Sequence, residues 1–459
     1  MNYSEVSIND LIPAAYNPRS IDADSLITLQ ELLKKLGDLI PIIVNKDNNT
    51  IIAGHQRTKA LKANGETTVK VFYVSGVNIS DEIIFNQLHN FQDTELNCKC
   101  SIDIDNLTDG FQTIDVNRIT IIKDGACSLA KTVKKILSKY GNVLTAVCCK
   151  GEVIIGNIYV YNCKLLGLNP NVYILPPDKY AIAQNFLLRR YGKFNYSKLK
   201  RATFVQGLAQ LNRNTEVKSD RKSFHSPLYK NFIFPRLKEI KGNKVLDFGA
   251  GKMAFAKKLA EFTEVCAIEF YINNRFSIDT KLSNKLIDYF IYSLETTGLF
   301  PYVVNEYVIN SVDSIEAENA VLGCLNTFCK LGGKLFFATR KLVKKEICCT
   351  KELNDTWNDA YFLDDNLFTA TFREGQWFYQ HFHTKDSVIK LINSFGFEIE
   401  TLKTDSSNFF IIAKKVREVS DEIKRKSVEF EFNLPLPNDN SYNRHNDVLS
   451  VLQKIGVLK

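Results

Sequence analysis

Hydrophobic and polar positions repeat with two different periods along the first part of the chain. Apolar side chains recur three and four positions apart over 22–36, between an aspartate cap and a glycine stop, which predicts an amphipathic helix. Short apolar runs at 41–44, 50–53 and 69–74 are bounded by turn residues and predict strands. The pattern therefore predicts a small α+β domain over residues 1–95.

A similar order of elements recurs between residues 110 and 178. A helix at 129–140 leads to a strand, a turn and an apolar strand that ends at Gly156, just as the matching strand of the first domain ends at Gly54. In both segments another glycine and another apolar strand follow. This order favours a degenerate second copy of the first domain. The alternative is that two small α/β units agree by chance.

The stretch 244–270 has the pattern of a strand, a tight turn, a helix and a second strand. Asp247, Gly249 and Gly251 lie in the turn, and a ligand can approach the backbone at glycine because it has no Cβ. The second strand ends at Glu269, where a nucleoside-binding βαβ unit holds a carboxylate for the ribose hydroxyls. The pattern predicts such a unit, and the alternative is an ordinary strand-to-helix turn.

The rest of the pattern extends this unit into a larger α/β domain over 224–417. A strand core at 302–304 is followed by a helix, and the glycine turn at 331–333 enters the next apolar strand. A helix that ends at Gly396 then precedes a terminal pair of strands.

The last segment, 418–459, alternates charged residues before a loop rich in proline and asparagine. Its pattern predicts an edge strand at 428–434 and a short helix at 447–455. The pattern does not indicate a function for this extension.

The acidic residue before the Gly-x-Gly turn resembles motif I of class I S-adenosylmethionine-dependent methyltransferases. The turn at 331–333 and the terminal strand pair are similar to later parts of that fold. The resemblance implies a Rossmann-like, seven-stranded domain and S-adenosyl-L-methionine as cofactor, and the chain departs from the family pattern at Ala254, where a third glycine is common. It implies that Asp247, Gly249 and Gly251 line the methionine part of the cofactor, that Glu269 contacts the ribose and that Asp279 contacts the adenine.

The turn after the 302–304 strand is the expected place for the methyl acceptor. It has neither the Asp/Asn-Pro-Pro-Tyr/Phe turn of DNA amino-methyltransferases nor the Pro-Cys nucleophile of cytosine-C5 enzymes. Glu306 or Asp313 is a candidate general base and Asn310 is a candidate for orienting the acceptor, although each also suits structural capping. His381 and His383 either contact substrate or pack, and a His-x-His pair alone is too weak a signal for a metal site. No metal site is therefore predicted.

In the first domain the sequence Gly-His-Gln-Arg stands where a strand meets a helix, at 54–57. The free N–H groups of a helix start and a forked arginine side chain form a site suited to phosphate. The region resembles the ParB/sulfiredoxin fold, which implies nucleotide phosphate binding by Gly54, His55 and Arg57. His55 stands where sulfiredoxin has its cysteine, so sulfinic acid reduction is not expected, and the second copy lacks the cation altogether. The alternative is that these residues merely cap the helix.

Positive charge is concentrated in the middle of the chain. The net charge is +8, yet 179–244 alone holds 16 Lys and Arg against three acids, with aromatic residues between them. Most of this segment forms the basic connector, which we place at 179–223. Its composition suits phosphate contacts and base stacking, and the alternative is a solvated helical linker. The candidate nucleic-acid contacts are Arg189, Arg190, Lys200 and Arg201.

The amino-acid composition indicates the cellular compartment in which the protein is expected. The chain is 45% hydrophobic, and no apolar run approaches the roughly 18 residues of a membrane helix, so no membrane partner is expected. The 11 cysteines are scattered without a C-x-x-C pair, which favours reduced thiols and a cytoplasmic protein over a disulfide framework. No signal peptide is expected from the N-terminal residues.

Taken together, the modules resemble phage and prophage fusions of a ParB-like domain with a methyltransferase. The expected function is S-adenosylmethionine-dependent methylation of DNA or of a modified nucleobase, targeted by the ParB-like module, with DNA as partner and a nucleoside triphosphate as a second ligand of that module. Two alternatives remain. One is a ParB-like, nucleotide-dependent DNA adaptor without methyl transfer, and the other is a small-molecule methyltransferase.

Overall fold

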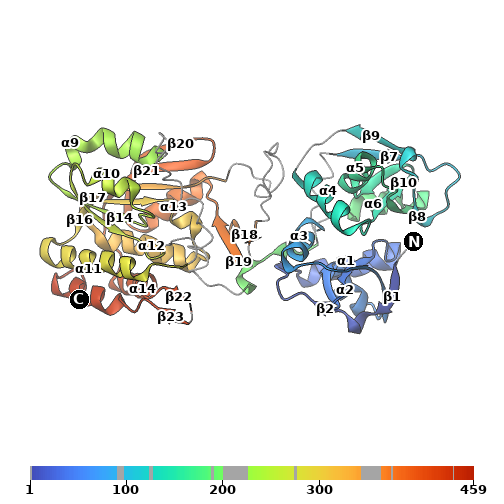
Figure 1. Cartoon of the computed structure of the whole chain (residues 1–459), viewed down its shortest axis with the longest axis horizontal. Helices are drawn as coiled ribbons and strands as arrows, with labels where there is room; N and C mark the ends of the chain where they lie inside the picture. Colours follow the sequence, from blue (N-terminus) through green and yellow to red (C-terminus); the bar gives the residue numbers. More distant parts are fainter. Residues whose placement is uncertain are drawn as a thin grey trace. The chain divides into compact units, whose positions relative to one another are not determined.

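The computed structural model describes residues 3–89, 98–123, 128–187, 191–199, 226–272, 277–342, 363–373, 376–437 and 439–459. The chain divides into two units, which we describe separately: residues 1–199 with 346–365, and residues 200–345 with 366–459 (Figure 1). Among the described residues no helix is both long enough and apolar enough to cross a membrane.

The first unit begins with a five-stranded sheet in the order β1-β6-β4-β5-β2. Its elements are β1 (Ser4–Ser7), β2 (Ile12–Pro13), α1 (Ala23–Leu36), β4 (Ile42–Asn45), β5 (Thr50–Ala53), α2 (His55–Ala63), β6 (Thr68–Val74) and α3 (Ile79–His89). The Asp22 side chain accepts the backbone N–H of Ser25 and so caps α1, as the sequence predicts. Leucines of α1 pack on the apolar side chains of β4 and β5, which places α2 beside α1.

A second sheet, of six strands, completes the first unit in the order β8-β12-β10-β11-β7-β9. The strands are β7 (Lys99–Ile102), β8 (Gly110–Thr113), β9 (Ile119–Lys123), β10 (Ala146–Cys149), β11 (Glu152–Ile155) and β12 (Asn171–Leu175). The helices are α4 (Ser128–Tyr140), α5 (Asn157–Leu166) and α6 (Tyr180–Phe186). The short strand β3 (Arg19–Ser20) pairs with β13 (Lys193–Phe194).

The two sheets share one connectivity. β4 pairs antiparallel with β5, α2 follows, and β6 returns parallel to β4. In the same way β10 pairs antiparallel with β11, α5 follows, and β12 returns parallel to β10. Both helices begin after a glycine with positive φ, Gly54 at +105° and Gly156 at +94°. The strand pairing is thus repeated, and the origin of the second sheet as a degenerate copy stays a prediction.

The second unit is built on one six-stranded sheet in the order β15-β14-β16-β17-β21-β20. The first four strands are parallel, and the hairpin of the last two runs antiparallel to β17. The strands are β14 (Lys244–Phe248), β15 (Glu264–Ile268), β16 (Phe300–Glu306), β17 (Cys329–Arg340), β20 (Phe397–Thr404) and β21 (Asn408–Lys415). The flanking helices are α9 (Leu237–Ile240), α10 (Ala254–Leu259), α11 (Thr280–Thr297), α12 (Ile315–Phe328) and α13 (Lys385–Ser394).

The predicted number of seven strands needs correction to six for the part of the chain that the structure describes. Only α11 lies between β15 and β16 among the described residues, and another parallel strand would need a crossover of its own.

Alternate side chains of the strands face opposite layers. Leu246 and Val303 pack with α11 and α12, whereas Val245 and Val304 pack on the other face with α9 and α10. Figure 1 shows α9 and α10 on one side of the sheet and α11 on the other.

The C-terminal extension belongs to the core of the second unit. It contains α14 (Asp421–Glu431), β22 (Pro435–Leu436), β23 (Asn440–Ser441) and α15 (His445–Lys454). The edge strand predicted at 428–434 is wrong, because Val428 and Phe432, four residues apart, point from the end of a helix into the same apolar core. A separate hairpin, β18 (Phe368–Arg373) with β19 (Gln376–His381), precedes α13.

Candidate functional site

The carboxyl ends of β14, β15 and β16 hold most of the predicted cofactor residues. Parallel pairing sets Asp247 beside Ala267 on one side and Val304 on the other, so Glu269 and Glu306 follow at the same edge of the sheet. This is the edge at which open α/β sheets bind their ligands. The structure therefore brings together the acidic residues that the sequence had selected from separate segments.

The glycine turn closes tightly over this edge. Gly249 has φ of +87°, and a Cβ built there would lie 2.2 Å from Cγ2 of Val308. Gly251 also has positive φ, at +56°, and its backbone N–H donates to Oε2 of Glu269 at 2.7 Å. Glycine is needed at Gly249 both for its backbone conformation and for the approach of the β16–α12 loop.

Glu269 is held by the backbone. Its second oxygen, Oε1, accepts the N–H of Tyr271 at 3.0 Å. Burial raises the pKa of the Glu269 carboxyl, while the N–H groups of Tyr271 and Gly251 act in the opposite direction. A carboxylate fixed in this way keeps lone pairs for further donors, which suits the hydroxyl groups of a ribose.

Asp247 is buried, and its carboxylate accepts a hydrogen bond from a tyrosine. The hydroxyl of Tyr229 donates to Oδ2 of Asp247 at 2.5 Å. Burial raises the pKa of Asp247 to about 7, although the bond from Tyr229 lowers it, and the charge of Glu269 raises it further. Tyr229 lies on the π-helical turn η6 (Tyr229–Ile233), and no local pattern in the sequence predicts this contact.

The acceptor candidates lie on and after β16. Glu306 accepts a hydrogen bond from Ser226, and burial raises its pKa to about 7. Asn310, on the short helix η8 (Ile309–Ser311), is fully buried, and its Oδ1 makes no hydrogen bond. Asp313 is also buried, and its charge helps to raise the pKa of Glu431. Glu306 thus has the pKa of a general base, and Asn310 has a spare acceptor atom.

Asp279, the predicted adenine contact, lies at the start of α11. It is the N-cap of α11, and its Oδ1 accepts the N–H of Leu282 at 3.0 Å. Sequence analysis also missed Glu431 of α14, which is buried and whose pKa is raised to about 8 by burial and by the charges of Asp313 and Glu269. The C-terminal extension therefore adds an acidic side chain close to the predicted ribose site.

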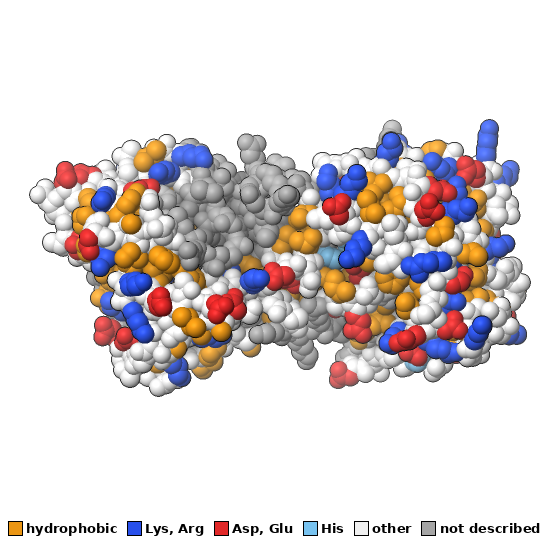
Figure 2. Space-filling model, turned by 180° about the vertical axis from the view of Figure 1, so that it is seen from behind, with side chains coloured by type: hydrophobic (Ala, Val, Ile, Leu, Met, Phe, Trp, Pro, Cys, Tyr) orange, Lys and Arg blue, Asp and Glu red, His pale blue; other side chains and the backbone are white. Residues whose placement is uncertain are grey.

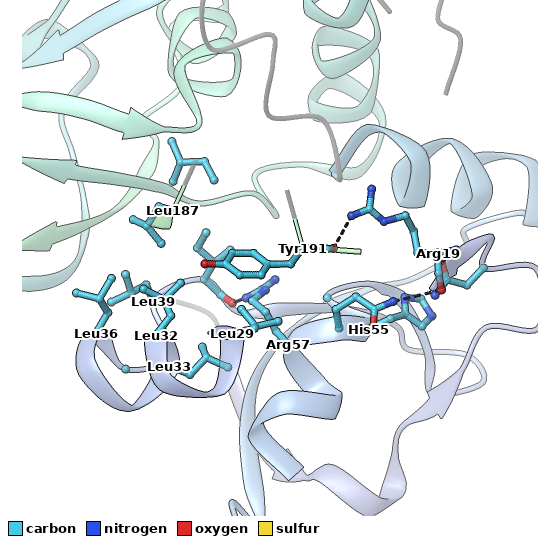
Figure 3. A pocket seen from close by; sticks show the side chains of 16 residues that line it. Arg19, Leu29, Leu32, Leu33, Leu36, Leu39, His55, Arg57, Leu187 and Tyr191 are labelled. Atoms are coloured by element: carbon cyan, nitrogen blue, oxygen red, sulfur yellow. Dashed lines mark hydrogen bonds between the residues drawn. The ribbon is translucent and has the colours of Figure 1, made fainter. Parts of the chain in front are cut away.

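In the first unit, Arg57 lines a cavity of about 130 Å³. Figure 3 shows its side chain beside the leucines of α1. Its guanidinium donates to the carbonyl of Ile40 and lies 3.7 Å from Asp38, a partner that the sequence did not reveal. Nη2 of Arg57 is buried and makes no hydrogen bond. A Cβ on Gly54 would lie 3.1 Å from this same atom, so the glycine leaves room for the arginine.

His55 lines the same cavity but is held within the fold. Its Nε2 accepts the N–H of Ala14 at 3.1 Å, and its Nδ1 lies 3.4 Å from the amide nitrogen of Asn86. Burial lowers the pKa of His55 to about 4, so the ring is neutral at physiological pH. These contacts engage both ring nitrogens, so the positive charges that line the cavity are those of Arg57 and Arg19.

The predicted nucleic-acid contacts lie outside the described residues: Arg189, Arg190, Lys200 and Arg201. On the face that Figure 2 draws, basic and acidic side chains of the described residues are interspersed over both units.

A family model matches the N-terminal part of the chain. The family model of the ParB N-terminal domain matches residues 1–85. No curated relative matches the chain.

Solved structures similar to this chain include several described as methyltransferases. One is the 1,6-didemethyltoxoflavin-N1-methyltransferase of Burkholderia thailandensis with S-adenosylhomocysteine, at 10% identity and a TM-score of 0.31, covering 47% of this chain and 88% of its own. Another is the N-methyltransferase NodS of Bradyrhizobium japonicum with S-adenosylhomocysteine, at 12% identity and a TM-score of 0.29, covering 46% of this chain and 100% of its own. A third is an S-adenosylmethionine-dependent methyltransferase of Clostridium acetobutylicum, at 11% identity and a TM-score of 0.32, covering 45% and 97%.

Proposed function

We propose that this chain is an S-adenosylmethionine-dependent methyltransferase that acts on DNA or on a modified nucleobase, and that its ParB-like module binds the nucleic acid or a nucleotide. The observation that carries the proposal is the set of carboxylates, Asp247 and Glu269, at the edge of a parallel sheet beside a glycine turn. The same chain carries a ParB N-terminal domain over residues 1–85, and that pairing supports a nucleic acid as substrate.

The residues fit the chemical groups of the cofactor. Ionised Asp247 suits the ammonium of the methionine part, and Glu269 suits the two ribose hydroxyls. Gly249 and Gly251 let the ligand approach the backbone of the turn. Bound S-adenosylmethionine would supply an electrophilic methyl group.

On the acceptor side, the buried Oδ1 of Asn310 suits an N–H or O–H donor of the substrate, and it would orient that group for attack. The carboxyl of Glu306, with a pKa of about 7, suits removal of the proton that the acceptor loses. Asp313, buried on the same loop, is an alternative base.

The phosphate-binding part of the proposal rests on Arg57 and on the basic connector. Nη2 of Arg57 lies at the start of α2 and is buried without a hydrogen-bond partner, which suits an anionic oxygen. The 16 Lys and Arg of 179–244 suit the phosphates of a polyanion.

The test is transfer of a labelled methyl group from S-adenosylmethionine to duplex DNA, to single-stranded DNA and to free nucleosides. We expect label on a nucleic-acid fraction with the wild-type chain and loss of the label with Glu269→Gln, which removes the carboxylate but keeps the shape. Cofactor binding without label on any of these acceptors would favour a small-molecule substrate. Absence of cofactor binding would instead leave the ParB-like adaptor as the function.

A further inference from the structure

Three side chains that the proposed reaction does not use meet inside the second unit. Glu318 lies in the first turn of α12, His381 ends β19, and His383 follows two residues later. Nδ1 of His381 lies 2.6 Å from Oε2 of Glu318, and Nε2 of His383 lies 3.3 Å from the same oxygen. One ligand atom from each residue lies within 4.8 Å of the others. The cluster thus converges on one point although its members are far apart in sequence.

The three side chains are buried, so their polar atoms need partners inside the protein. The three residues are 2–5% exposed, and buried polar atoms are nearly always hydrogen-bonded. Nε2 of His383 lies 3.3 Å from Oε2 of Glu318, and it has no well-aligned hydrogen-bond partner. A network of hydrogen bonds alone therefore leaves a buried ring nitrogen unsatisfied, and that nitrogen faces the carboxylate of Glu318.

We propose that Glu318, His381 and His383 bind a divalent transition-metal ion of the Zn²⁺ class. Two imidazoles and one carboxylate are a donor set that such ions prefer. With metal–ligand bonds of about 2.1 Å, tetrahedral geometry separates neighbouring ligand atoms by about 3.4 Å. The separation from Oε2 of Glu318 is 3.3 Å for His383 and 2.6 Å for His381, so the His381 pair would open by about 0.8 Å on binding.

Hydrogen bonds and packing hold the three proposed ligand residues in place. The backbone N–H of His383 donates to the carbonyl of Arg340 at 3.1 Å, and its own carbonyl accepts the N–H of Leu342 at 2.8 Å. The ring of Phe368 stacks on His381 with centroids 4.1 Å apart. Glu318 follows the N-cap Ser314, whose side chain accepts from Ala317. Such support orients the ligands before the metal arrives, which favours binding.

The ion would connect three segments around the acceptor loop. β19 packs against η8, the short helix that carries Asn310, and α12 begins just after that loop. The metal would fix the β18–β19 hairpin and α12 to each other, and so hold η8 between them. This gives the site a structural role beside the acceptor residues, separate from the methyl transfer itself.

The test uses the full-length chain without an affinity tag, stripped with a chelator and then titrated with Zn²⁺ by calorimetry and with Co²⁺ by visible absorption. We expect one equivalent of either ion, and for Co²⁺ the d–d bands of a low-coordinate nitrogen and oxygen site. Glu318→Gln and His383→Gln should each weaken binding by more than about 100-fold, since even partners outside the metal shell are worth 10–100-fold. The matched control is His445→Gln on α15, which lies outside the cluster and should keep the wild-type affinity.

Two results would overturn the proposal. One is a wild-type chain that takes up less than one equivalent of Zn²⁺ and shows no Co²⁺ bands, which would leave a His–Glu–His hydrogen-bonded network. The other is equal affinity in the wild type and in folded Glu318→Gln. If a variant does not fold, the wild-type chain decides, because Zn²⁺ bound to the native state must raise its thermal midpoint and a chelator must reverse the rise.

Discussion

Asp247 is the residue whose ionisation controls the proposed cofactor site. Its pKa is about 7 because of burial, so it becomes protonated, and loses its attraction for an ammonium group, as the pH falls below 7. We expect the affinity for S-adenosylmethionine to be constant above about pH 8 and to fall by close to tenfold per pH unit below about pH 6. Calorimetric titration between pH 5.5 and 8.5 measures this dependence.

Asp247→Asn is the matched control, since it removes the titrating group and keeps the side-chain shape. The variant should bind more weakly at pH 8 and show a much flatter profile. A wild-type affinity that does not change between pH 8 and pH 5.5 would contradict the role of Asp247.

A second prediction for a single residue concerns Gly249, in the glycine turn after β14. Its φ of +87° disfavours any side chain, and a Cβ would also lie 2.2 Å from Val308. Gly298 has a similar φ of +73°, but no atom lies within 4 Å of its would-be Cβ. We expect Gly298→Ala to lower the free energy of unfolding by about 1–3 kcal/mol, because its backbone (φ 73°, ψ −154°) lies in a region that is essentially restricted to glycine, and Gly249→Ala to lower it by roughly 1–3 kcal/mol more because of the steric conflict. Urea unfolding of both variants gives the comparison, and equal costs would mean that the β16–α12 loop moves away freely.

At the scale of elements, α14 joins the C-terminal extension to the cofactor edge. Phe432, at the end of α14, is fully buried and its ring packs against Phe270, Phe290 and Phe328. Phe270 follows Glu269 directly. Loss of the Phe432 ring should therefore affect the stability of the second unit and the position of the predicted ribose carboxylate together.

We expect Phe432→Ala to destabilise the second unit by about 3–5 kcal/mol and to weaken cofactor binding measurably. Ile423→Ala on the same helix is the control, because Ile423 is 39% exposed and should cost little. Urea unfolding and calorimetric titration of both variants give the two quantities. A Phe432→Ala variant with unchanged stability and affinity would show that the extension is not coupled to the site.

Local signals in the sequence predicted those elements whose cause is local. Gly54 and Gly249 mark turns with positive φ, and both occur where the pattern changes from strand to helix. The segment 428–434 was mispredicted because Val428, Phe430 and Phe432 alternate with polar residues, whereas Val428 and Phe432 also share one helical face, and packing against α12 favours the helix.

Contacts between distant segments gave no such signal. Glu318 and His381 are 63 residues apart, and only the fold brings them together. Tyr229 and Asp247, and Arg57 and Asp38, likewise meet through packing that no spacing in the sequence reveals. The sequence therefore indicated the sheet edge at which the candidate site is proposed, while the partners that set the pKa values there could be identified only from the structure.

For the whole molecule, the proposal requires that nucleic-acid binding and cofactor binding are carried by different parts of the chain. Lysines and arginines that neutralise phosphates release counterions, and each contact contributes about 0.9 to the slope of log affinity against log salt concentration.

Replacing Arg189, Arg190, Lys200 and Arg201 by glutamine should therefore reduce that slope for duplex DNA by up to about 3.6. The affinity for S-adenosylmethionine should stay at the wild-type value, because Asp247 and Glu269 lie on β14 and directly after β15, and the four substituted residues belong to neither strand. Fluorescence anisotropy of labelled DNA at several salt concentrations measures the slope. A slope equal to that of the wild type would remove the basic connector from the DNA contact, and the anion site at Arg57 would then be the part of the chain to test for nucleotide binding.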